Sequence, residues 1–87
     1  MSGPTEKLDI ERIQTGVRVE RRLLKVLKAL AAYKNVTLGD LLEGIVLHAF
    51  EGKTAFTAET LKKIAELKRI YDLDLDAQSS HRLREKP

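Results

Sequence analysis

One segment with a two-residue period, residues 12–19, constrains the fold of this chain more than any other feature. Its β-branched positions fall on one side and its other positions on the opposite side: Ile13, Thr15, Val17 and Val19 against Arg12, Gln14, Gly16 and Arg18. This alternation is typical of a half-buried β-strand. The chain has no second strand pattern, and a single strand leaves backbone groups unpaired along both edges. We therefore expect the segment to pair with the same segment of a second copy.

Helical periodicity follows this strand pattern. The first predicted helix covers residues 20–33 and has an apolar stripe of Leu23, Leu24, Leu27, Leu30 and Ala31. Asn35 tolerates the left-handed conformation that ends a helix, and Thr37 is a good N-cap for the next one. The second predicted helix, residues 38–50, has an apolar face too broad for one short partner helix to cover. This breadth again indicates a second chain.

A third helix is predicted from Thr57 to about residue 71. Its apolar stripe consists of Leu61, Ile64, Ala65, Leu67 and Tyr71. Residues 72–76 then alternate aspartate with leucine. The last ten residues, 78–87, are polar and charged, a composition typical of disorder.

Positive charge gathers in one part of the chain. The formal net charge is only +3, but residues 13–34 hold six bases and one acid, a net charge of +5. Basic clustering of this kind is the electrostatic signature of a polyanionic partner, although a solvated helix face rich in lysine and arginine would have the same composition.

Several classes of protein have no support in the sequence. The chain has no cysteine, and its two histidines, His48 and His81, are too few and too far apart to indicate a metal site. It has no phosphate-binding glycine motif and no nucleophile–base pair, so we expect neither an enzyme nor a cofactor. It also has no apolar h-region near the N-terminus and no membrane-spanning run, so we expect a cytoplasmic protein.

The order of strand, basic helix, Asn-x-Thr turn and strongly apolar helix resembles the ribbon-helix-helix family, which includes the Arc and MetJ repressors. The resemblance covers residues 12–50. It implies a mostly α fold with one short β-strand, in which two copies form an intertwined homodimer through an intermolecular two-stranded antiparallel ribbon. A C-terminal extra helix would be added to this unit. The ribbon would enter the major groove of double-stranded DNA, as in a repressor of transcription.

The resemblance also implies roles for individual residues. The base-reading positions would be Gln14, Gly16 and Arg18, with Arg12 beside them, although a glycine cannot read a base by its side chain. Arginine suits guanine and glutamine suits adenine in the major groove. Thr37 and the amides of Leu38 and Gly39 would hold a DNA phosphate at a helix N-terminus. The dimer core would contain Val17, Val19, Leu27, Leu38, Leu42, Val46 and Phe50.

These expectations divide the chain into four parts. Residues 1–11 would be a flexible arm, residues 12–51 the DNA-binding and dimerisation domain, residues 52–77 a helical extension, and residues 78–87 a disordered tail. The homodimer could form higher oligomers on DNA. Residues 52–77 could bind a protein partner, and in that case the chain would be the antitoxin of a toxin–antitoxin pair. A second alternative is a structural oligomerisation module that binds no nucleic acid.

Overall fold

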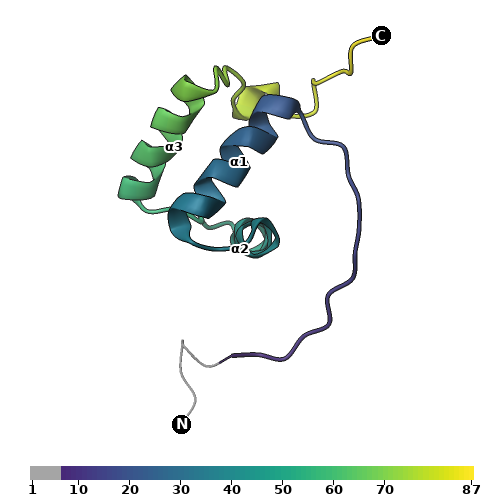
Figure 1. Cartoon of the computed structure of the whole chain (residues 1–87), viewed down its shortest axis with the longest axis vertical. Helices are drawn as coiled ribbons and strands as arrows, with labels where there is room; N and C mark the ends of the chain where they lie inside the picture. The colour runs from purple at the N-terminus through teal and green to yellow at the C-terminus, as the bar shows by residue number, and fades with distance from the viewer. Residues whose placement is uncertain (1–6) are drawn as a thin grey trace.

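A computed structural model describes residues 7–87 and contains three α-helices and one short 3-10 helix. The elements are α1 (Arg21–Lys34), α2 (Leu38–Phe50), α3 (Ala58–Ile70) and η1 (Ala77–Ser79). α1 and α3 lie side by side, and α2 lies across the far end of α1 (Figure 1). The first six residues of the expected N-terminal arm lie outside the described residues.

The helix boundaries follow from local chemistry that the sequence displays. Asn35 adopts the left-handed conformation, with φ 59° and ψ 44°, and its amide donates back to the last turn of α1. Each helix has a side-chain oxygen that accepts a hydrogen bond from a first-turn amide: Glu20 from Leu23 at 2.8 Å, Thr37 from Asp40 at 3.0 Å, and Thr57 from Thr60 at 3.2 Å. The predicted caps at Thr37 and Thr57 are confirmed.

The core of the single chain is small and lies where the three helices meet. Leu30, Ala31 and Leu41 are buried at its centre. Partly buried side chains surround them: Leu27, Val36, Ile45, Phe56, Ile64 and Leu67. Leu73, after α3, is also buried, with 7% of its surface exposed. α1 thus supplies two of the three central residues and α2 the third, while α3 covers part of the core.

The expected fold class is wrong in its defining element. Residues 7–87 contain no β-strand, so residues 12–19 form no ribbon, and a ribbon-helix-helix fold requires one. The physical reason is that no other segment of residues 7–87 offers a strand edge, so the backbone groups of residues 12–19 have no ladder to join. The inward positions of the pattern are exposed: 81% of Ile13 and 79% of Val17.

Residues 7–20 leave the helical body as an extended arm. The arm starts at the N-terminus of α1 and passes down one side of the molecule to a point below α2 (Figure 1). The radius of gyration is 14.8 Å, larger than the roughly 12 Å of a compact domain of this length.

Among the described residues, no helix has the length and apolarity needed to cross a membrane.

Candidate nucleic-acid interface

Two ion pairs hold the extended arm, one near its middle and one near α1. Near the middle, the Arg12 guanidinium donates to both carboxylate oxygens of Glu43 in α2, at 2.9 and 2.8 Å. This two-point hydrogen bond is the main cause of the lowered pKa of Glu43 and the raised pKa of Arg12. At the proximal end, the Arg18 guanidinium pairs with Glu85, near the C-terminus of the chain. Arg12 and Arg18 are therefore both paired with carboxylates in the free chain.

Gln14 and Gly16 lie between these two anchors, and both are exposed. A Cβ atom added to Gly16 would meet no other atom within 4 Å. The glycine is therefore not required by packing within one chain. All four predicted base-reading residues lie on the arm and face solvent or a solvent-exposed carboxylate.

Arg22, in the first turn of α1, has more acceptors than any other cation in the described residues. Its guanidinium donates to Glu20 at 3.1 Å and to the backbone oxygen of Asp72 at 2.9 Å, and it pairs with Asp74 at 3.0 Å. The hydrogen bond to Glu20 is the largest cause of the raised pKa of Arg22. This residue ties the segment after α3 to the start of α1.

A basic stripe runs along the exposed side of α1. It consists of Arg21, Lys25 and Lys28, whose spacings of four and three residues place them on one helix face. All three are exposed, and none of the ion pairs among residues 7–87 involves them. These residues belong to the basic cluster of residues 13–34, which the sequence displays without marking out a single face. Their spacing is the signal that could have marked them as one site.

The predicted phosphate-binding turn lies at the other end of α1. The Thr37 hydroxyl accepts from the Asp40 amide, while the amides of Leu38 and Gly39 belong to the first turn of α2. Two carboxylates, Asp40 and Glu43, lie within this turn and the next. The 14 residues of α1 separate Thr37 from the junction between the arm and α1, where Arg18 lies, by about 20 Å. The structure therefore does not bring the turn and Arg18 together.

Most residues predicted for the dimer core are exposed in the single chain. The exposed fractions are 79% for Val17, 40% for Val19, 39% for Leu42, 43% for Val46 and 81% for Phe50. Leu27 packs against the core of its own chain, and Leu38 is half-buried. An apolar face on α2 thus remains uncovered, formed by Leu42, Val46, Leu47 and Phe50.

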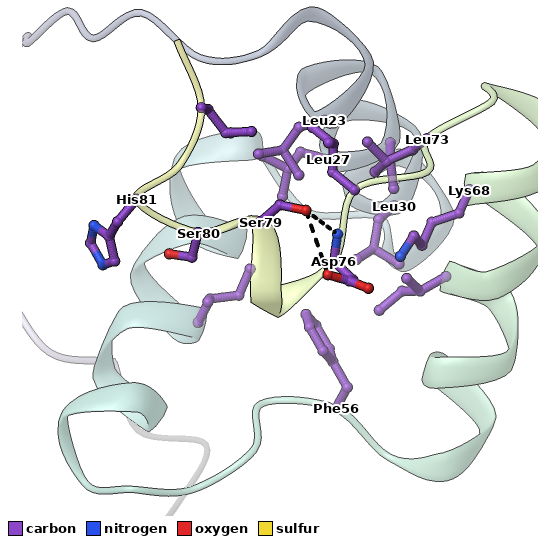
Figure 2. Close-up of a pocket in the computed structure, with 15 residues that line it drawn as sticks. Leu23, Leu27, Leu30, Phe56, Lys68, Leu73, Asp76, Ser79, Ser80 and His81 are labelled. Carbon is purple, nitrogen blue, oxygen red and sulfur yellow. Dashed lines mark hydrogen bonds between the residues drawn. The ribbon is translucent and has the colours of Figure 1, made fainter.

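A cavity of about 410 Å³ lies between α1, α3 and the segment that follows α3. Leu23, Leu27 and Leu30 line one wall, and Phe56 points into it from below (Figure 2). Part of its polar lining is already engaged: Asp76 accepts from Gln78 at 3.0 Å and caps η1 together with Ser79. The His81 ring points away from the labelled leucines (Figure 2). This lining offers apolar contacts and brings no acid–base pair together.

No metal centre emerges from the described residues. They contain no group of three or more histidine, aspartate or glutamate side chains placed to hold an ion. His48 Nδ1 lies 2.7 Å from the Gly44 carbonyl oxygen, within its own helix.

Comparisons of the chain with protein-family models, with curated proteins and with solved structures found no match in any of the three.

Proposed function

We propose that this chain binds double-stranded DNA and regulates transcription by occupying its site. The observation that carries the proposal is the basic stripe Arg21, Lys25 and Lys28, which continues directly from an extended arm that carries Arg12 and Arg18. From Arg21 to Lys28 the stripe rises about 10 Å along α1. That length corresponds to about three base-pair steps along one DNA strand, at 3.4 Å of axial rise each.

The arm is the element we assign to base recognition. An extended, uncovered peptide is thin enough to enter a DNA groove, as the N-terminal arms of several DNA-binding domains do in the minor groove. Arg18 and Arg12 would hydrogen-bond to base edges or be attracted by the negative potential of a narrow minor groove. The Gln14 side-chain amide would hydrogen-bond to a further base edge. The stripe on α1 would fix the arm by phosphate contacts, which position the protein but carry no sequence information.

A second copy of the chain belongs to this proposal. The uncovered face of α2 exposes four large apolar side chains, which is costly for a protein that acts alone in water. A homodimer that buries this face would present two arms and two basic stripes. When one unit of the dimer is bound to DNA, the second unit is held near its own site at a high effective concentration. The dimer therefore binds more tightly than a single unit.

The proposal is tested with duplex DNA selected from a random pool and measured by fluorescence anisotropy over a range of salt concentrations. Changing Arg21, Lys25 and Lys28 together to glutamine should weaken binding to all sequences similarly. It should also reduce the slope of log Kd against log salt concentration by about 2–3, because each lost phosphate contact lowers that slope by about 0.9. Arg18→Ala should instead cost about 1–3 kcal/mol at the selected site and reduce sequence preference.

Lys62→Ala is the matched control, since Lys62 is an exposed cation on α3, away from the stripe and the arm. It should leave both the affinity and the salt dependence nearly unchanged. Binding through phosphate contacts is strongest at low salt, so roughly 50 mM salt is a favourable condition for detecting it. If the wild-type chain binds no duplex under that condition, the proposed function is wrong.

A further inference from the structure

The segment after α3, residues 72–85, is anchored by its leucines and presents its acids outward. Leu73 is buried and Leu75 is half-buried, and both line the cavity that Leu23 and Leu27 of α1 also line. The Leu73 amide also donates to the Lys68 carbonyl at 2.8 Å. The alternation of aspartate and leucine over residues 72–76 therefore separates an apolar side, which docks on the body, from an acidic side.

The acidic side meets the start of the proposed DNA interface. Asp74 and the backbone oxygen of Asp72 engage Arg22, at 3.0 and 2.9 Å. Further along, Glu85 engages Arg18. Both arginines lie at the junction between the arm and α1, where the chain passes close to its own C-terminal segment (Figure 1).

A carboxylate and a DNA phosphate compete for the same guanidinium, because each is an anion with two oxygens that can accept its paired N–H groups. The Arg18–Glu85 pair is exposed, with 84% and 68% of the two side chains open to solvent. Arg22 is less exposed, at 36%. Contacts of this kind are weak enough for DNA to displace and strong enough to reduce its affinity.

We propose that residues 72–85 act as an intramolecular competitor that occupies Arg18 and Arg22 in the free chain and leaves them when DNA binds. This inference builds on the proposed function and adds a regulatory device to it. Any change that removes negative charge from Asp74 or Glu85, or that draws the segment away, would raise DNA affinity. The leucines keep the segment close, so the competition is intramolecular and independent of protein concentration.

Point substitutions test this better than a truncation, because removing the C-terminus would also remove Arg82, Arg84 and Lys86. The double variant Asp74→Asn, Glu85→Gln should bind duplex DNA about threefold to tenfold more tightly than the wild type, the range expected for releasing two exposed ion pairs. The gain should shrink at high salt, where such pairs are screened.

The control double variant Glu59→Gln, Glu66→Gln removes the same two charges from α3, where they contact neither arginine. It should change affinity by less than about twofold. A second readout is amide hydrogen exchange of the full-length wild type, in which residues 72–76 should exchange faster after DNA is added.

The outcomes separate this inference from the proposed function. If the wild type binds DNA and the double variant binds equally well, the competitor role is wrong while DNA binding stands. The same conclusion holds if both double variants gain affinity equally, because the effect would then come from net charge. If no variant binds any duplex, the proposed function fails and the inference fails with it.

Discussion

At the scale of single residues, Leu30 determines whether the helices hold together. It has 2% of its surface exposed and lies at the centre of the small core. Leu30→Ala should lower the free energy of unfolding by about 2–5 kcal/mol, through lost burial and the cavity left behind. Urea denaturation measures this loss. Ile70→Ala is the control, since Ile70 is 67% exposed at the end of α3 and should cost less than about 0.5 kcal/mol.

At the scale of the element, α1 depends on an unusual N-cap. Glu20 takes the capping place usually held by serine, threonine, aspartate or asparagine, and its carboxylate accepts from the Leu23 amide. This hydrogen bond is the largest cause of the lowered pKa of Glu20. A carboxylate there also interacts favourably with the positive end of the helix dipole.

The lowered pKa of Glu20 gives a pH-dependent prediction. Because the folded-state pKa lies below the unfolded value of about 4.3, the carboxylate contributes stability above that value and loses it as pH falls through the folded pKa. Glu20→Gln should therefore be less stable than the wild type at pH 7, and the difference should be smaller at pH 3. Thermal unfolding followed by circular dichroism at both pH values checks this. A stability difference that is equal at the two pH values would contradict the role of the charge.

At the scale of the whole molecule, the uncovered face of α2 predicts a dimer. Sedimentation at micromolar concentration should give twice the mass of one chain. Val46→Asp places a charge where the second copy would cover it, so it should shift the protein to monomer or unfold it, because an unpaired buried charge is strongly unfavourable. His48→Asp is the control, since His48 is exposed and lies about 200° around the helix from Val46. A folded wild-type monomer at that concentration would contradict the prediction.

The sequence by itself determined the helices and their ends. Apolar stripes with a 3.6-residue period predicted the three helices. Asn35, Thr37 and Thr57 predicted where helices stop and start, because capping depends on a few neighbouring residues. The second helix was expected at residues 38–50 and is observed as Leu38–Phe50. The concentration of bases before residue 35 was also visible in the sequence.

Only the tertiary structure decided what the remaining segments do. The two-residue period of residues 12–19 predicted a strand, but strand formation needs a partner edge from elsewhere. The rest of the described residues provides none, so the segment is an exposed arm. Pairing between residues far apart in sequence is equally invisible in local patterns. The pair formed by Arg18 and Glu85 spans 67 positions, and that of Arg22 with the Asp72 carbonyl spans 50. Such contacts depend on how α1 and α3 pack, which brings the acidic segment back to the start of α1.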